Sequence, residues 1–149
     1  MDALPALLFL ALVLAYPAFQ FRRWLKRRAA FREFASARGL RFRGTIPSDK
    51  YVPYAVFRHV AHAALLHHVV EGRLNGFDIA VFDFPKRGGT HTGAIVSGLP
   101  VVDAPAPRPD GELLFDLQDG HLLGFRPVVP IEDLPAFVES VMSVARRAP

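Results

Sequence analysis

The chain opens with a long stretch that carries no charge. Residues Ala3 to Phe21 are 19 consecutive uncharged positions, rich in Leu. As a helix rising about 1.5 Å per residue, the stretch would measure about 28 Å, which is close to the hydrocarbon thickness of a bilayer. We therefore predict a transmembrane anchor over residues 1–21, with the rest of the chain folding outside the membrane.

The same stretch differs from a cleaved signal peptide. Signal peptides carry a basic segment before an apolar core of about 7–15 residues and end at a small-residue cleavage site. Here the charged residue before the run is Asp2, and the run ends in large aromatic residues. These features favour retention of the segment as a signal anchor.

Basic residues follow the anchor at once. Of the 18 Lys and Arg residues, nine lie between residues 22 and 43, and none precedes the anchor. Because basic flanks stay in the cytoplasm, we expect the N-terminus outside and the C-terminal domain in the cytoplasm. Residues 22–39 predict a basic juxtamembrane helix that ends at Gly39. The side chains expected at the membrane interface are Arg22, Arg23, Trp24, Lys26, Arg27 and Arg28.

The basic character does not extend into the rest of the chain. Residues 44–149 contain nine basic and 12 acidic side chains. A nucleic-acid-binding domain would carry its positive charge on the folded body, so the charge distribution argues against this class and we expect no nucleic-acid partner. Anionic lipid head groups are the partner that suits the basic stretch, since each cation near a negative leaflet gains about 1 kcal/mol. Plain positive-inside topology explains the stretch equally well.

Apolar patterns after residue 40 predict a sheet of about five strands. The clearest unit is a hairpin of His68–Leu74 and Phe77–Phe84, because Asn75-Gly76 between them accepts positive φ. Asp78 and Asp83 are expected to face solvent or lie in turns. The other predicted strands are His91–Leu99 and a second hairpin of Glu112–Gln118 with His121–Arg126, which makes five, and Leu40–Arg43 is a candidate for a short additional strand.

Helical and irregular segments complete an α+β prediction. Ile131–Arg147 has the apolar stripe of an amphipathic helix, which we expect to lie across one face of an antiparallel sheet. Pro53–Leu66 predicts a short helix with Tyr54, Phe57, Ala61 and Leu65 on one face. Four prolines within residues 100–110 predict a surface linker. Residues 40–149 would then form one cytoplasmic α+β domain.

Composition and motifs exclude several kinds of chemistry. The chain has no Cys, so thiol nucleophiles, disulfides and cysteine metal sites are absent. It lacks the glycine-rich phosphate loops, H-E-x-x-H and G-x-S-x-G. Ser97, His91 and Asp83 form a triad only on paper, because no nucleophile elbow accompanies them. We predict no catalytic residue, no cofactor and no small-molecule substrate.

Histidine is the enriched polar residue type. His59, His62, His67 and His68 lie within ten residues. On a helix, His59 and His62 would be three apart and able to chelate a divalent metal, but a structural zinc site normally has four ligands. Solvated histidines on a loop that faces a partner are the simpler interpretation, so we predict no metal site and keep this pair as a candidate.

The hairpin and its surroundings resemble an uncharacterised family of small bacterial single-pass membrane-anchored proteins with a cytoplasmic α+β domain. The shared features are one N-terminal helix, an A-x-x-R-G-L segment (Ala35 to Leu40), a G-x-x-x-G hairpin ending in V-F-D (Gly72 to Asp83), and Leu99-Pro100 after the third strand. The resemblance implies a location in the bacterial inner (cytoplasmic) membrane. It implies no catalytic residue.

These observations favour a non-enzymatic accessory subunit that packs against a larger integral membrane protein complex, of the respiratory or photosynthetic type. The uncharged helix, the small body without a catalytic motif and the proline-rich arm lead to this hypothesis. The alternative is a free-standing membrane-anchored module that binds lipid or protein, and a lesser one is a histidine-dependent metal site or enzyme. Expected partner contacts are Phe9, Phe19, Phe31, Phe34, Pro105 and Pro107.

Overall fold

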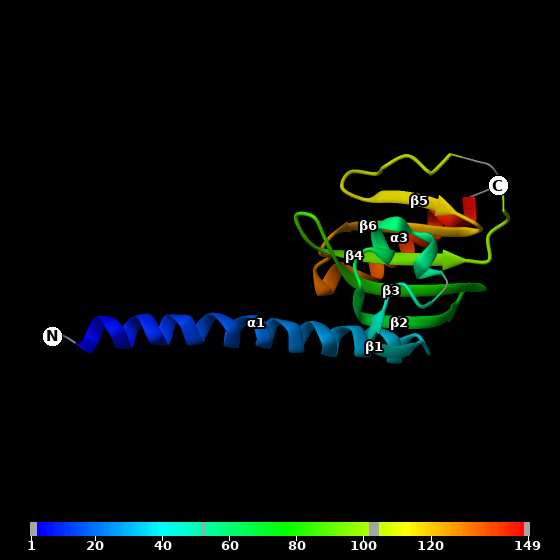
Figure 1. Ribbon diagram of the computed structural model, residues 1–149. Coiled ribbons are helices and arrows are strands. Elements are labelled where there is room, and N and C mark those ends of the chain that lie inside the picture. The colour runs from blue at the N-terminus through cyan, green and yellow to red at the C-terminus, as the bar shows by residue number, and fades with distance from the viewer. Residues whose placement is uncertain (1–2, 52, 102–104, 148–149) are drawn as a thin grey trace.

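The protein consists of a long N-terminal helix, a six-stranded antiparallel sheet and a C-terminal helix (Figure 1). The structure is a computed structural model that describes residues 3–51, 53–101 and 105–147. This arrangement confirms the predicted α+β class, with one strand more than the five expected. The sheet order is β1-β2-β3-β4-β6-β5.

Helix α1 runs without interruption from Ala3 to Ala37, through Pro17. It ends in a Schellman motif, in which Leu40 N donates to Ala35 O at 2.8 Å and Gly39 N donates to Ser36 O at 3.3 Å. Gly39 has φ +66°, which an L side chain rarely adopts. The predicted juxtamembrane helix and its glycine stop therefore belong to the same helix as the apolar run.

The strands follow the predicted hairpins closely. The β2–β3 and β5–β6 turns fall at Asn75-Gly76 and Asp119-Gly120, with positive φ at all four residues. The first strand is longer than expected because it pairs with β2 as far as Pro47. The strands are β1 (Arg41–Pro47), β2 (Leu65–Leu74), β3 (Phe77–Lys86), β4 (Gly89–Ser97), β5 (Leu114–Gln118) and β6 (His121–Pro127).

Each face of the sheet buries its own core. The second half of α1 and helix α3 (Leu134–Arg147) cover one face, where Phe31 and Phe137 join the core. A short segment of η1 (Tyr54–Val56) and α2 (Arg58–Ala61) covers the other face, where Phe57 joins the core (Figure 1). Helix α3, with the turn η2 (Ile131–Asp133) before it, confirms the predicted C-terminal helix.

The helix predicted over Pro53–Leu66 is wrong in extent. The chain forms only the 3₁₀ turn η1 and the four-residue α2, and Leu65 already lies in β2 with an exposed side chain. Ala64, with φ +61°, ends the helical segment, and its carbonyl accepts a hydrogen bond from Ser48 N at 3.0 Å. Pairing with β1 therefore starts a strand where helical spacing alone predicted helix.

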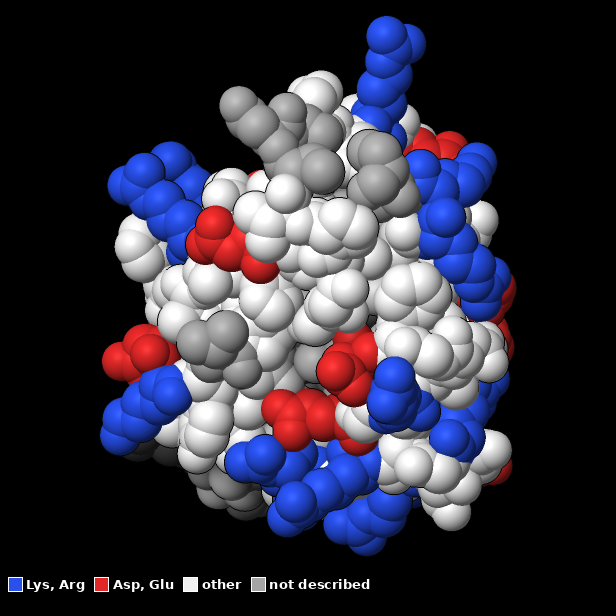
Figure 2. All heavy atoms as spheres, turned by 90° about the vertical axis from the view of Figure 1, so that its right-hand side faces the viewer, with Lys and Arg blue, Asp and Glu red and all other residues white. Residues whose placement is uncertain are grey.

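The first half of α1 stands apart from the domain. Leu4–Ala37 is the one helix in the described ranges that is long and apolar enough to cross a membrane, a property that signal sequences share. Its large side chains from Leu4 to Phe21 are exposed, and it projects from one end of the domain (Figure 1). On the opposite end, acidic and basic side chains are interspersed (Figure 2).

Of the partner contacts predicted on α1, two are exposed and two are buried. Phe9 and Phe19 are exposed, as a docking role requires. Phe31 and Phe34 are buried in the core, so their assignment as partner contacts is wrong: their helix face packs on the protein's own sheet. In the connection between β4 and β5, Pro105 is exposed and Pro107 is half-buried, and residues 102–104 lie outside the described residues.

Candidate functional site

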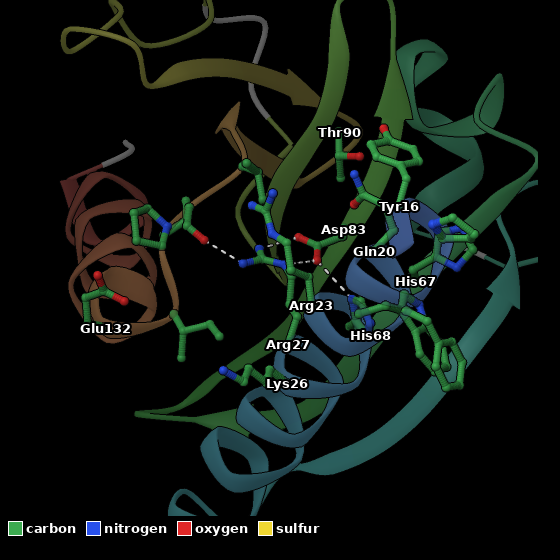
Figure 3. A pocket seen from close by; sticks show the side chains of 17 residues that line it. Tyr16, Gln20, Arg23, Lys26, Arg27, His67, His68, Asp83, Thr90 and Glu132 are labelled. Carbon is green, nitrogen blue, oxygen red and sulfur yellow. Dashed lines mark hydrogen bonds and ion pairs between the residues drawn. The ribbon is translucent and has the colours of Figure 1, made fainter. Parts of the chain in front are cut away.

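A groove lies where α1 leaves the domain. It has a volume of about 1130 Å³ and is bounded on one side by α1 from Tyr16 to Arg27. The other side is formed by β2, β3, the start of β4 and the segment from Val128 to Glu132. Figure 3 shows these two sides, with Arg27, Asp83 and His68 at the base.

Arg27 joins the helix to the domain at the base of this groove. Its Nη1 donates to Val129 O at 2.6 Å, and its Nη2 donates to Asp83 Oδ1 at 2.7 Å and to Thr92 Oγ1 at 2.8 Å. Its Nε donates to the second oxygen of Asp83, which makes the pair bidentate. The guanidinium also lies 5.2 Å from the ring centroid of Phe31. One side chain thus connects α1 to β3, β4 and the segment after β6.

Asp83 is a buried carboxylate with four donors. Besides the two from Arg27, it accepts a hydrogen bond from Thr92 Oγ1 at 2.9 Å and pairs with His68 Nδ1 at 3.0 Å. Burial alone raises the pKa of Asp83, but the hydrogen bonds from Arg27, His68 and Thr92 outweigh it and hold the pKa below its usual range. The carboxylate is therefore charged at neutral pH. The prediction that Asp83 faces solvent or lies in a turn is wrong, because the side chain is buried in β3.

His68 reaches this carboxylate through an irregularity in β2. The pairing of β2 with β3 shifts register between His67 and Val70, and His68 has φ +54°. Its ring lies 5.6 Å from the ring of Trp24 and 5.4 Å from that of Phe31, measured between centroids. The bulge directs this polar side chain toward the face of the sheet that α1 covers. His68 is therefore buried, whereas the sequence pattern predicted a solvated side chain.

Strand alternation positions the other two groups. Asp83 and Thr92 are directly paired across β3 and β4, so their side chains lie on the same face of the sheet. Thr92 Oγ1 accepts hydrogen bonds from Val129 N, at 3.0 Å, and from Arg27 Nη2. The Thr92 hydroxyl in turn donates a hydrogen bond to Asp83 Oδ1. The network is closed around Thr92, which makes the segment after β6 a part of it.

The hydrogen bonds of this cluster support a structural role for it. A His–Asp pair can orient a general base, but the base must reach a proton to be transferred. His68 Nε2 is buried and, within the described ranges, has no hydrogen-bond partner. Both carboxylate oxygens of Asp83 are occupied by donors. What the arrangement does is fix the position of α1 at the point where it leaves the sheet.

Ser97, His91 and Asp83, considered above as a catalytic triad, do not lie together. Asp83 pairs with Thr92, whereas Ser97 pairs with Asp78 at the other end of β3 and β4. Ser97 Oγ instead hydrogen-bonds His121 Nδ1 at 2.8 Å. His91 contacts the carbonyl of Gly89 through Nδ1 at 3.4 Å. The three predicted residues therefore do not form one site.

The metal candidates are exposed and lie beside positive charge. His59 and His62 line a small pocket of about 390 Å³ together with Lys86 and Arg87. Within residues 3–51, 53–101 and 105–147, no group of three His, Cys, Asp or Glu side chains is arranged to hold a metal ion. Nearby cations oppose metal binding, so the structure gives this pair no support as a metal site.

The predicted interface residues separate into two groups. Arg22, Arg23 and Lys26 are exposed on α1 just beyond the apolar run, and Trp24 is half-buried beside His68. Arg28 lies over the rings of Trp24 and Phe42, at 5.2 and 5.8 Å. Arg27 is no free interface cation, because the domain buries it against Asp83.

Sequence reasoning missed His68, Asp83 and Thr92 as a group. One signal was present, since Asp83 continues the alternating apolar positions Ile79 and Val81, which face the core. A charged residue in such a place needs a buried partner. That partner, Arg27, lies 56 residues earlier, so local patterns could not identify it.

Comparisons of the chain with protein-family models, curated proteins and solved structures give no match. The resemblance to bacterial membrane-anchored proteins therefore stays a prediction.

Proposed function

We propose that this protein is a non-enzymatic, single-pass membrane protein whose domain lies on the cytoplasmic side and acts as an accessory subunit of a larger integral membrane complex. The observation that carries the proposal is the division of α1. Its large apolar side chains from Leu4 to Phe21 are exposed, and those before Tyr16 lie outside the groove, while Phe31 and Phe34 of the same helix are core residues. Such a helix holds the domain in a fixed position relative to the bilayer.

The free half of α1 suits packing against other membrane helices. It presents large apolar side chains, including Phe9 and Phe19, and residues 3–21 include no Asp, Glu, His, Lys or Arg. The Arg27–Asp83 pair supports the same role, because it resists rotation of the helix against the sheet. A catalytic role gains no support from His68, whose Nε2 is enclosed.

Capture from native membranes tests this proposal. The tagged protein is extracted in mild detergent, captured, sized by chromatography, and its companions are identified by mass spectrometry. We expect stoichiometric recovery within one large assembly. Elution as a monomer or homo-oligomer without companions would contradict the accessory role. The host class expected from the sequence, a respiratory or photosynthetic complex, is tested by the same companions.

A matched variant separates anchoring from packing. Residues 4–15 are replaced by an unrelated apolar helix of equal length, which leaves the groove residues from Tyr16 onward unchanged. We expect this variant to stay in the membrane fraction after alkaline carbonate extraction but to lose the companions. Retention of the companions would place the contact on the domain instead of on α1.

A further inference from the structure

We propose that the groove between α1 and the domain is a binding site for the head group and upper acyl chains of one anionic phospholipid. The inference rests on the membrane anchoring proposed above and adds a defined site and ligand to it. It follows from where the groove lies along α1, from the kinds of side chain that line it, and from the charges that the ion pair leaves free.

The groove lies at the depth where a phospholipid phosphate would lie. Tyr16 and Pro17 line it from the last turns of the apolar run, and Arg23 and Lys26 line it just after the run ends. The rise from Tyr16 to Arg23 is about 10 Å on a helix, comparable to the depth from the phosphate to the upper acyl chain. The groove therefore crosses the boundary between hydrocarbon and head groups.

Its walls match a molecule with an apolar and an anionic part. On the domain side, Val128 and Ile131 are among the few large apolar side chains outside α1 that the structure describes as exposed, at 45% and 41%. They face the groove opposite the aromatic side chains of Tyr16 and Phe21. Acyl chains between these walls would cover apolar surface that water otherwise contacts.

The free charges of the groove favour an anion. Asp83 is neutralised by Arg27, which leaves Arg23 and Lys26 as cations and Glu132 as the remaining acid of the lining. Figure 3 shows Glu132 beside α3, across from the α1 side chains. The side chains of Gln20 and Thr90 add hydrogen-bond donors to the lining of the groove. A phosphate bound in the groove would have its negative charge compensated by Arg23 and Lys26.

The single tryptophan makes this site directly observable. Trp24 is the one tryptophan of the chain and lines the groove. The full-length protein is placed in phosphatidylcholine nanodiscs that contain a minor share of brominated phosphatidylglycerol or, in a parallel sample, of brominated phosphatidylcholine. We expect Trp24 fluorescence to be quenched more strongly by the brominated anionic lipid, because that lipid concentrates in the groove.

Matched charge variants test the role of the two cations. Arg23→Gln with Lys26→Gln removes both groove cations, whereas Arg32→Gln with Arg41→Gln removes two exposed cations of the same basic stretch that neither line the groove nor belong to the expected interface set. We expect the preference for the anionic lipid to fall about fivefold per groove cation, the equivalent of about 1 kcal/mol each. The control pair should keep the preference, and Arg23→Lys with Lys26→Arg should keep it as well.

The possible results separate this inference from the anchoring on which it rests. Equal quenching by the two brominated lipids in the wild type, or equal loss in both variant pairs, would overturn the groove site and leave the anchor intact. Absence of quenching by either lipid would contradict membrane insertion itself, and the groove site with it. Added inorganic phosphate should not relieve the quenching; relief would show that the site takes the free ion and overturn the lipid assignment.

Discussion

Asp83 and Arg27 share a site that water hardly reaches, and this determines what their loss should cost. Their side chains are 2% and 15% exposed. Breaking a buried ion pair by removing one partner typically costs about 3–5 kcal/mol, because the other charge stays buried without compensation. The chain therefore depends on this pair more than on its surface salt bridges, such as Arg146–Glu139.

The first prediction concerns Asp83→Asn. We expect the free energy of unfolding to fall by about 3–5 kcal/mol, because Arg27 keeps its charge and loses its partner. Urea unfolding of the full chain in detergent, followed by Trp24 fluorescence, measures the change. Asp78→Asn on the same strand is the control: that side chain is exposed, so its effect should stay within about 0.5 kcal/mol. An unchanged urea midpoint for Asp83→Asn would show that the pair is not what holds α1.

The second prediction concerns pH. Burial lowers the pKa of His67, and the nearby His68 lowers it further. Burial also lowers the pKa of His121. Because the unfolded imidazoles titrate near 6.5, the stability linked to these groups is present above about pH 6.5 and is lost as pH falls through the folded values. NMR titration should give midpoints below 6.5 for both rings. Midpoints at or above 6.5 would contradict the burial that the structure shows.

Asp83 should respond only in stronger acid. Its pKa is held below the usual range, so its contribution is present above about pH 4, the unfolded value, and disappears as pH falls through the folded value. The acid sensitivity of the wild type below about pH 4 should therefore be smaller in Asp83→Asn, which has no carboxylate to protonate there. Parallel unfolding curves at pH 3 to 7 check this expectation.

At the scale of elements, the contact between α3 and the sheet depends on a missing side chain. A Cβ at Gly124 of β6 would lie 2.5 Å from Val141 Cγ2 and 3.3 Å from Phe115 Cε1. We expect Gly124→Ala to destabilise the domain by about 1–3 kcal/mol through overpacking. In Gly124→Ala with Val141→Ala the clash is removed, so the double variant should be more stable than the sum of the single effects implies. Strict additivity in urea unfolding would contradict this packing.

The elements that could be predicted are those specified locally. Asn75-Gly76 places a hairpin because both residues take positive φ, and the apolar stripe of Ile131–Arg147 places a helix. The helix prediction over Pro53–Leu66 was wrong in extent because the last two residues, Leu65 and Leu66, pair with β1, a contact that helical spacing does not reveal. Likewise Phe31 and Phe34 have the spacing of a helix face, but spacing does not tell whether that face meets a partner or the protein's own sheet.

The candidate site was less predictable for the same reason. It joins α1, β2, β3 and β4 with a segment 102 residues from Arg27, and the bulge that aims His68 at Asp83 has no local signature in the chain. The basic stretch was identified, but the one cation that the fold buries, Arg27, could not be told apart from its neighbours Lys26 and Arg28.

At the scale of the whole molecule, the two halves of α1 have different surroundings. Its first half presents apolar side chains along its length, and its second half completes the core of an α+β domain. The groove, the buried pair and the first cations all lie where these halves meet. A rigid connection of this kind would transmit the position of a membrane partner to the domain without a flexible linker.

The most direct test of this account is the accessibility of single cysteines introduced into the full chain, which has none of its own. Asp2→Cys and Ser140→Cys place a thiol before the apolar run and on the exposed side of α3. With a membrane-impermeant maleimide on spheroplasts, we predict labelling of Asp2→Cys at once and of Ser140→Cys only after permeabilisation, with both proteins in the carbonate-resistant membrane fraction. Labelling of Ser140→Cys in intact spheroplasts, or release of the protein by carbonate, would contradict a cytoplasmic domain held by a retained transmembrane helix.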